Sequence, residues 1–216
     1  NDIDVICIQE TRIENKEDLL VYTMEDYTMH CSPCTGYKYG TAIAIHNKHI
    51  DRIIGAKGHN DRHVEVYMAE PGYPTSGKSP KVLRIHSIYG PQNEQRTLQD
   101  ERDRKRFWTN TDEILKEKLV GVRTLDIVGA DCNGRLATAH GSREIGPYCL
   151  HEEFTKNGLS VLELMINNKL KAVNTLKLSD EDEHGVDISK MSNDMKKSKL
   201  STFNTSKGGH QIDYVL

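Results

Sequence analysis

The chain has 216 residues, of which 36% are hydrophobic and 28% are charged, and its formal net charge is -3. This length suits one domain with a full core, and no run of about 18 apolar residues is present, which excludes a membrane-spanning helix. The small net charge neither supports nor excludes a nucleic-acid partner, because a local basic face can lie on an acidic protein. Five cysteines, an odd number spread through strand-like segments, favour free thiols in a reducing compartment over a disulfide framework.

The first half of the chain predicts several short strands and one helix. Val5–Ile8 is a continuous apolar run, typical of a strand covered on both faces. Asn15–Met24 is predicted as a helix, with Asn15 as its cap. Further strands, the last two forming a hairpin across Gly- and Pro-rich turn residues, are expected at Tyr27–Cys31, Thr41–His46, Val64–Ala69 and Val82–Tyr89.

The second half predicts longer helices between strands. Apolar residues at helical spacing indicate a helix over Thr97–Leu119 and another marked by Leu159, Leu162, Ile166 and Leu170. Strands are expected at Leu125–Ala130, Leu170–Leu178 and Ile212–Leu216. Ser179–Leu200 has almost no core residues, so it is predicted to be a flexible surface loop. Strands that alternate with helices indicate a mixed α/β fold.

Both ends of the chain fall beside apolar runs. The sequence begins at Asn1 just before Val5–Ile8, and it stops at Leu216 inside Ile212–Leu216. We therefore expect residues 1–216 to be a single domain that lacks its first strand and its last strand and loop.

Acidic and amide residues follow several of the predicted strands. Glu10 follows the first, Asp131 and Asn133 follow Leu125–Ala130, and Asp213 lies in the last. Strand ends at one edge of a sheet can converge, and carboxylates brought together repel by roughly 4 kcal/mol at about 4 Å unless a cation lies between them. Mg²⁺ suits a site with few carboxylates, waters and a phosphate. Any one such residue alone is more often a solvated turn residue.

Four segments resemble the motifs of the endonuclease/exonuclease/phosphatase family, in the order in which the family carries them. They are Ile6-Cys7-Ile8-Gln9-Glu10-Thr11, Ile88-Tyr89-Gly90-Pro91-Gln92-Asn93, Val128-Gly129-Ala130-Asp131-Cys132-Asn133 and Gln211-Ile212-Asp213-Tyr214-Val215-Leu216. The resemblance covers the chain except Ser179–Leu200. It implies an α/β (α+β) four-layer sandwich of two mixed β-sheets flanked by helices.

The resemblance also implies a role for each matched residue. Glu10 would bind Mg²⁺, with Mn²⁺ as the alternative ion, and Asp131 would orient or deprotonate the attacking water. Asn133 would hold phosphate oxygens, Tyr89 would contact the phosphate, and Asp213 would pair with a histidine. The products would carry a 5′-phosphate and a 3′-hydroxyl.

Three further residues are candidates for contact with nucleic acid. Arg12 lies just after Glu10, and Gln92 and Asn93 follow Tyr89. The lysine and arginine clusters elsewhere favour a solvated surface. Cys31 and Cys34 with His46 and His49 resemble a zinc finger only superficially, since their spacing and the strand between them are wrong for one.

The subfamily is indicated by Ile145-Gly146-Pro147, Asn157-Gly158-Leu159 and Val173-Asn174-Thr175, which resemble the endonuclease domain of non-LTR (LINE-type) retrotransposons, itself similar to apurinic/apyrimidinic endonucleases. This resemblance implies a monomeric DNA-nicking domain of a polyprotein with reverse transcriptase, nuclear or cytoplasmic, with no membrane partner. Two alternatives stay open: a decayed element remnant that keeps the fold without catalysis, and an abasic-site repair endonuclease. A phosphatase of small esters fits the motifs less well.

Departures from the family pattern affect activity. The opening strand and the family histidine are absent from residues 1–216, Ala130 replaces a glycine beside Asp131, and Phe203 stands where the family has tryptophan. We therefore expect this chain by itself to be weakly active or inactive.

Overall fold

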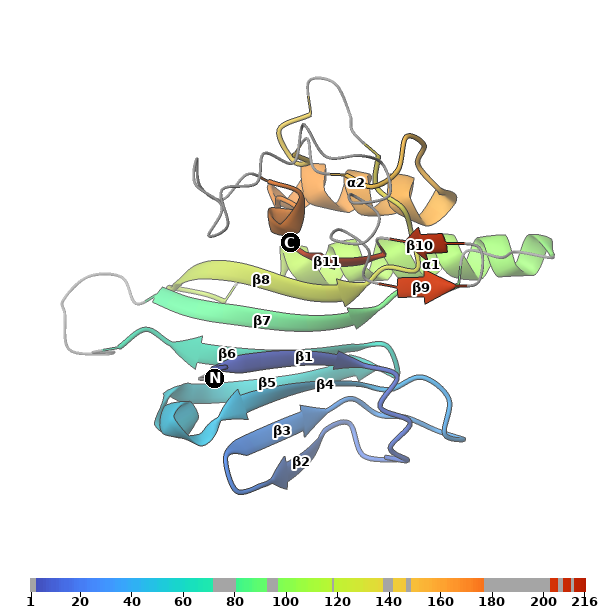
Figure 1. Ribbon diagram of the computed structural model, residues 1–216. Helices are drawn as coiled ribbons and strands as arrows, with labels where there is room; N and C mark the ends of the chain where they lie inside the picture. Colours follow the sequence, from blue (N-terminus) through green and yellow to red (C-terminus); the bar gives the residue numbers. More distant parts are fainter. Residues whose placement is uncertain are drawn as a thin grey trace. The chain divides into compact units, whose positions relative to one another are not determined.

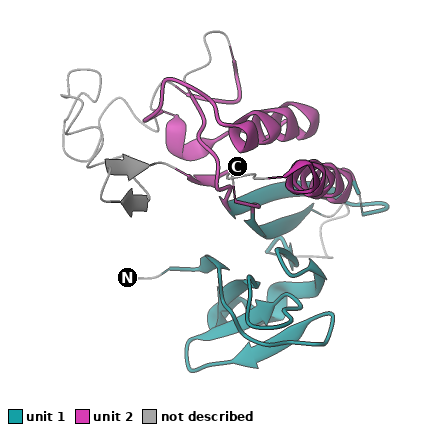
Figure 2. Cartoon of the chain, turned by 90° about the vertical axis from the view of Figure 1, so that its right-hand side faces the viewer, with its two compact units in different colours: residues 1–89, 117–130 teal, residues 90–116, 131–216 magenta. Residues whose placement is uncertain are grey.

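The computed structural model describes residues 3–71, 81–92, 97–117, 119–137, 142–146, 149–176 and 212–216, together with the backbone of 203–205 and 208–210 (Figure 1). The chain forms two compact units (Figure 2). Unit 1 comprises residues 1–89 and 117–130, and unit 2 comprises residues 90–116 and 131–216. The expectation of a single domain stays a prediction.

Unit 1 contains a four-stranded antiparallel sheet in the order β1-β4-β3-β2. Its strands are β1 (Val5–Gln9), β2 (Leu20–Thr23), β3 (Tyr27–Cys31) and β4 (Thr41–His46). Residues of β4 are nearly all buried, as expected for an inner strand, and the three predicted strands of this sheet are confirmed.

A second set of strands in unit 1 is hydrogen-bonded in the order β8-β7-β6-β5. They are β5 (Ile53–Asn60), β6 (His63–Ala69), β7 (Lys81–Tyr89) and β8 (Arg123–Asp131), and a 3₁₀ helix, η1 (Asn47–Arg52), precedes them. The predicted hairpin is confirmed as the antiparallel pair β6–β7, whereas β7 and β8 run in the same direction (Figure 1). The first half of β8 is less buried than predicted, since Leu125 is 65% exposed.

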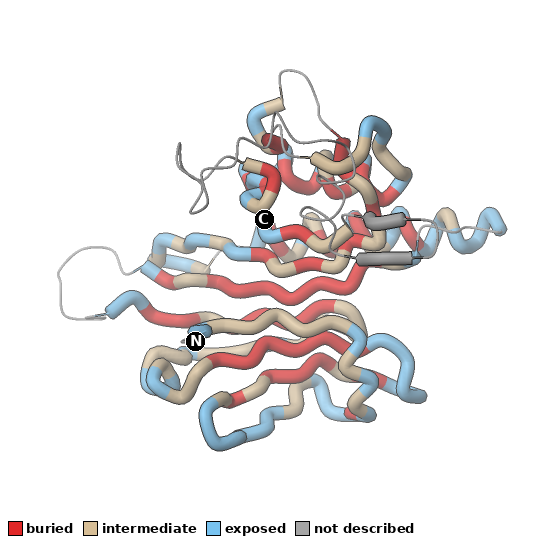
Figure 3. Tube along the Cα trace, viewed as in Figure 1, coloured by how far each residue is buried: buried red, intermediate tan, exposed pale blue. Residues whose placement is uncertain are grey.

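The apolar core of unit 1 lies between these two sets of strands. Alternate residues of β4, β6 and β7 form it, namely Ile43, Ile45, Val64, Val66, Met68 and Ile85 (Figure 3). These β-branched and flexible side chains fill the space between two pleated surfaces. The core therefore fixes the strands whose ends carry the candidate site residues of unit 1.

The helix predicted over Asn15–Met24 is wrong. Asn15 makes a two-way backbone pairing with Cys34, and Leu20–Thr23 pairs antiparallel with β3. The buried Asn15 side chain accepts the Glu17 amide and donates to the carbonyl of Ser32. This local side-chain bonding replaces the hydrogen bonds that a helix would need.

Unit 2 contains α1 (Leu98–Lys116) and α2 (Lys156–Asn168), and the predicted long helix is confirmed with a slightly earlier end. The second predicted helix is confirmed as α2. Of the residues that marked it, Leu170, just beyond its end, is buried, whereas Leu159 and Ile166 are 54% and 55% exposed and Val161, Leu164 and Met165 form the buried face instead. No helix of the described chain is long and apolar enough to cross a membrane.

The remaining elements of unit 2 are short. They are η2 (Val173–Thr175), β9 (Phe203–Thr205), β10 (Gly208–His210) and β11 (Asp213–Val215). The strand predicted at Leu170–Leu178 is wrong where it is described, since Thr175 bonds back to Ala172 in a 3₁₀ turn. The last predicted strand is confirmed as β11. The predicted loop Ser179–Leu200 lies outside the described residues.

A fully buried polar cluster lies in unit 1. Glu65 accepts from Arg84 at 3.1 Å and lies 3.5 Å from His86, whose Nδ1 is 3.1 Å from Nε2 of His63. Burial holds the pKa of His63 well below its usual range, and burial likewise lowers the pKa of His86. Both rings are therefore neutral in the folded protein.

We expect this cluster to make folding stability fall with acidification. Below about pH 6.5 each histidine takes up a proton more readily in the unfolded chain than in the folded one, so the free energy of unfolding drops by up to about 1.4 kcal/mol per pH unit for each. Urea unfolding from about pH 7.5 to about pH 5.5 measures this slope. His63→Leu should reduce the slope, while His49→Gln, which changes a histidine paired with Asp4 outside the cluster, should preserve it. An unchanged slope in His63→Leu would contradict this assignment.

Candidate active site

The end of β1 places Glu10 in a left-handed backbone conformation. Pairing of β1 with β4 ends at Gln9 and Thr41, and Glu10 then has a φ of 55°. The turn is held by two backbone hydrogen bonds, from the Thr11 amide to the Gly40 carbonyl and from the Arg12 amide to the Tyr39 carbonyl. Gly40 has a φ of +84°, and a Cβ there would lie 2.3 Å from Oγ1 of Thr11, so the position requires glycine. A left-handed glutamate is strained, and such strain is frequent at functional sites.

Two side chains hold the carboxylate of Glu10. The hydroxyl of Tyr89, at the end of β7, donates to its Oε1, and Arg12 donates to its Oε2 at 2.8 Å. These hydrogen bonds, that from Tyr89 first, lower the pKa of Glu10, so the carboxylate is charged at neutral pH. The ion pair with Arg12 is largely exposed and adds about 1 kcal/mol at most.

Arg62 and Tyr39 complete this group, and the sequence interpretation missed both. The guanidinium of Arg62 lies 3.6 Å from the ring centroid of Tyr39 and 4.9 Å from that of Tyr89. It also donates to the Tyr89 carbonyl at 3.3 Å, while the Tyr89 amide donates to the Arg62 carbonyl at 2.8 Å. Arg62 thus fixes the ring that holds Glu10. No local motif marked these two residues.

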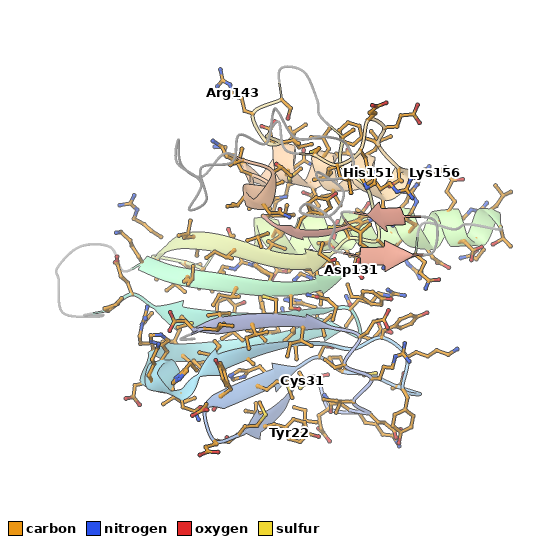
Figure 4. All side chains as sticks on the ribbon, in the orientation of Figure 1. Tyr22, Cys31, Asp131, Arg143, His151 and Lys156 are labelled. Carbon is orange, nitrogen blue, oxygen red and sulfur yellow. The ribbon has the colours of Figure 1, made fainter. Side chains whose placement is uncertain are left out.

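In unit 2, Asp131 and Asn133 form a tight turn after β8. Oδ1 of Asp131 accepts the backbone N–H of Asn133 at 2.8 Å, and Asn133 has a φ of 45°. The Asn133 side chain donates to the carbonyl of Gly90 at 2.9 Å, and the Gly90 amide donates to the carbonyl of Asp131 at 2.7 Å. Figure 4 labels Asp131 at the end of β8. The turn leaves the second amide hydrogen of Asn133 for another acceptor.

Asn157, at the start of α2, supports this turn and was not predicted to have a role in it. Its side-chain amide donates to the carbonyls of Pro91 at 2.5 Å and of Asn133 at 3.1 Å. Its Oδ1 accepts from the indole of Trp108 at 3.1 Å. A buried asparagine that satisfies several loop groups fixes them in one arrangement.

In unit 2, Asp213 follows Ile212, whose carbonyl accepts the backbone N–H of Cys132 at 3.0 Å, so Asp213 comes close to the Asp131–Asn133 turn. Burial, and then the charges of Asp131 and Asp213, raise the pKa of the Cys132 thiol well above its usual range. The backbone of Asp213 is held by Asn174, whose amide donates to its carbonyl at 3.1 Å. His210 belongs to β10, and only its backbone is described.

The structure therefore groups the predicted residues within each unit. Glu10, Arg12 and Tyr89 are together in unit 1, and Asp131, Asn133 and Asp213 are together in unit 2. Their joint action on one phosphodiester stays a prediction. Gln92 is exposed in unit 2, and Asn93 lies outside the described residues.

The donor chemistry at Glu10 fits a hydrated Mg²⁺. Within the described chain, no three His, Cys, Asp or Glu side chains are grouped so as to hold a metal ion by themselves. Mg²⁺ usually keeps several waters and binds through only one or two carboxylates. Glu10 offers one charged carboxylate whose side chain is 42% exposed, which is the donor set such an ion needs.

We expect Tyr89→Phe to raise the pKa of Glu10 toward its ordinary value, because the hydroxyl that stabilises the charged carboxylate is removed. A carbon-13 NMR titration of the side-chain carboxyl group measures this pKa. Tyr39→Phe is the matched control, since Tyr39 contacts Arg62 through its ring. An unchanged Glu10 pKa in Tyr89→Phe would show that the hydroxyl does not hold the carboxylate in solution.

Comparison with solved structures identifies the fold. The catalytic domain of APE2 from Xenopus laevis is similar to this chain, with a TM-score of 0.58 and 14% sequence identity, over 99% of this chain and 73% of that chain. No protein-family model and no curated protein matches the sequence. At this identity the likeness concerns the fold, and the predicted fold class, an α+β fold of two sheets with helices, is confirmed.

Proposed function

We propose that this chain belongs to a metal-dependent phosphodiester hydrolase of the endonuclease/exonuclease/phosphatase family that nicks DNA. The observation that carries the proposal is the charged carboxylate of Glu10, held by Tyr89 and Arg12 at the end of β1. The four sequence motifs and the fold likeness to the APE2 catalytic domain support the same assignment.

The proposal assigns Mg²⁺, or Mn²⁺ in its place, to Glu10. When bound, the ion would neutralise phosphate charge and stabilise the leaving oxygen. The hydroxyl of Tyr89 has one proton, which it donates to Glu10. A phosphate oxygen can receive that proton only if Tyr89 releases Glu10. Substrate binding would thus switch the Tyr89 hydroxyl from carboxylate to phosphate.

The residues of unit 2 would act on water and phosphate. Asp131 already accepts the Asn133 amide through Oδ1, and the proposal assigns its carboxylate to orienting and deprotonating the attacking water. The side-chain amide of Asn133 would donate its second hydrogen to a phosphate oxygen. Asp213, at the start of β11, would pair with a histidine. Cleavage would leave a 5′-phosphate and a 3′-hydroxyl.

The finer assignment is a retrotransposon-type endonuclease that acts on undamaged duplex DNA. It rests on the segments around Ile145, Asn157 and Val173; Asn157 lies in the first turn of α2, and Val173–Thr175 forms η2. An abasic-site endonuclease is the second candidate, because the fold likeness to the APE2 catalytic domain supports it equally. The third candidate is a remnant of a decayed retrotransposon that keeps the fold but does not cleave DNA.

We expect two substitutions, made in a protein that contains residues 1–216, to impair Mg²⁺-dependent nicking of supercoiled plasmid. Asp131→Asn should lower the rate by about 10²–10⁴-fold, the usual contribution of one general base. Glu10→Gln should raise the Mg²⁺ concentration needed for half-maximal activity. Glu17→Gln makes the same chemical change at an exposed glutamate in the same segment, and its activity should match that of the parent. Nicking that persists in Asp131→Asn with chelator present would place the active site elsewhere.

The choice of substrate separates the two candidate nucleases. We expect undamaged duplex DNA and duplex DNA with one abasic site to be nicked at comparable rates under one set of conditions. A preference for the abasic duplex above about a thousandfold, or roughly 4 kcal/mol of differential transition-state stabilisation, would instead assign the protein to repair.

A further inference from the structure

We propose that a groove between α1 and α2 in unit 2 binds an acidic segment of a protein partner. In this arrangement a carboxylate of the partner pairs with Arg104, and an apolar side chain beside it contacts Leu159 and Trp108. The proposal concerns a second site and does not rest on the nuclease assignment.

The groove has an apolar floor of fixed shape. It encloses about 630 Å³ and is lined by residues of both helices, among them Trp108, Leu159 and Leu164. The indole of Trp108 is 5% exposed and donates to Asn157, which holds the ring in place. Leu159 is 54% exposed in the groove wall. An apolar residue of a partner would remove this leucine from water, which stabilises the complex.

Arg104 is the strongest sign that the groove takes an anion. Its residue is 5% exposed, and Nη1 donates to the Lys156 carbonyl at 3.2 Å and to Oγ of Ser160 at 2.8 Å. Its Nε is buried, and among the described residues it has no hydrogen-bond partner and Arg104 has no carboxylate within ion-pair distance. Burying a charge without a counter-ion is costly unless a ligand compensates it. A carboxylate in the groove would supply that compensation.

The surroundings of Arg104 add positive charge. Lys156 is the first residue of α2 and is exposed beside the groove (Figure 4). It makes no ion pair with any side chain that the structure describes. The amino end of α2 adds its partial positive charge to the same region. Lys105 also lines the groove, although Glu101 lies 3.5 Å from its ammonium group.

The acidic residues of the groove favour a peptide over a nucleic acid. Glu101, Asp112 and Glu163 line it together with the cations. A phosphate backbone carries a charge on every nucleotide and would meet these carboxylates. A peptide can place one carboxylate on Arg104 and keep neutral or basic residues near Glu163. Charge complementarity therefore indicates a partner segment with an acidic residue next to a large apolar one.

The only tryptophan of the chain, Trp108, makes the test specific to this groove. Its fluorescence is followed while a short synthetic peptide is added to the full chain. The peptide has one Glu next to one Leu, flanked by neutral residues, and the matched ligand has Gln in place of that Glu. We expect a saturable change with the Glu peptide and none with the Gln peptide. Lys156→Glu should weaken binding about tenfold or more, and Lys171→Glu, an exposed lysine that does not line the groove, should bind as the parent does.

Arg104→Met should abolish the response, and Lys156→Glu provides the same test without disturbing a buried residue. Equal responses to the Glu and Gln peptides, no response to either, or unchanged binding in Lys156→Glu would each overturn the proposal. A saturable response to a single-stranded oligodeoxynucleotide that Lys156→Glu removes, without one to the peptide, would assign the groove to nucleic acid instead. The titration needs neither metal nor DNA cleavage, so its outcome is independent of the nuclease assignment.

Discussion

The antiparallel pairing of β1 with β4 is the constraint on which the Glu10 group depends. Its register sets Gln9 opposite Thr41, so the next residue leaves the sheet where Gly40 can accept the Thr11 amide. The left-handed turn that follows turns the Glu10 carboxylate toward the Tyr89 hydroxyl at the end of β7. A one-residue slip would turn the side chains of β1 to the opposite faces of the sheet. The buried core beneath β4 prevents such a slip.

Asn133 and Asn157 have the corresponding role in unit 2. The Asp131–Asn133 turn has no regular secondary structure, so side-chain amides take over the bonding of its backbone groups. Asn157 extends this network to Trp108 in α1 and so connects the turn to both helices. A change in the α1–α2 packing would thus reach the Asn133 carbonyl through a single buried side chain. Trp108 also lines the proposed peptide groove.

The sequence predicts elements well where local pattern and tertiary burial agree. The strands β3, β4, β6 and β7 and the helix α1 follow from alternation or helical spacing alone. Prediction from the sequence fails where a pairing partner far away in the chain decides the secondary structure. Leu20–Thr23 is a strand because it pairs with β3, and nothing in its own spacing requires that. In α2 the exposed Leu159 misled the assignment of the buried face, because the buried Asn157 satisfies loop carbonyls rather than packing as an apolar residue.

The same limit applies to the candidate site. Glu10, Tyr89, Asp131 and Asn133 could be found because each sits in a short recognisable motif directly after a strand. Arg62 and Tyr39 could not, because their importance comes from stacking on a ring that is 27 positions away from Arg62 in the chain. Local sequence therefore marks the residues proposed to do chemistry, while the residues that position them become visible only in three dimensions.

The claim that Glu10 holds the divalent ion is the centre of this account, and Mn²⁺ tests it most directly. Paramagnetic Mn²⁺ broadens the NMR signals of nuclei near its binding site, so it can be titrated into nitrogen-15-labelled protein. The account predicts early loss of the amide signals of Glu10, Thr11 and Gly40, persistence of that loss in Glu17→Gln, and its disappearance in Glu10→Gln. Broadening that leaves these amides unaffected, or that is the same in Glu10→Gln as in the parent, would contradict it.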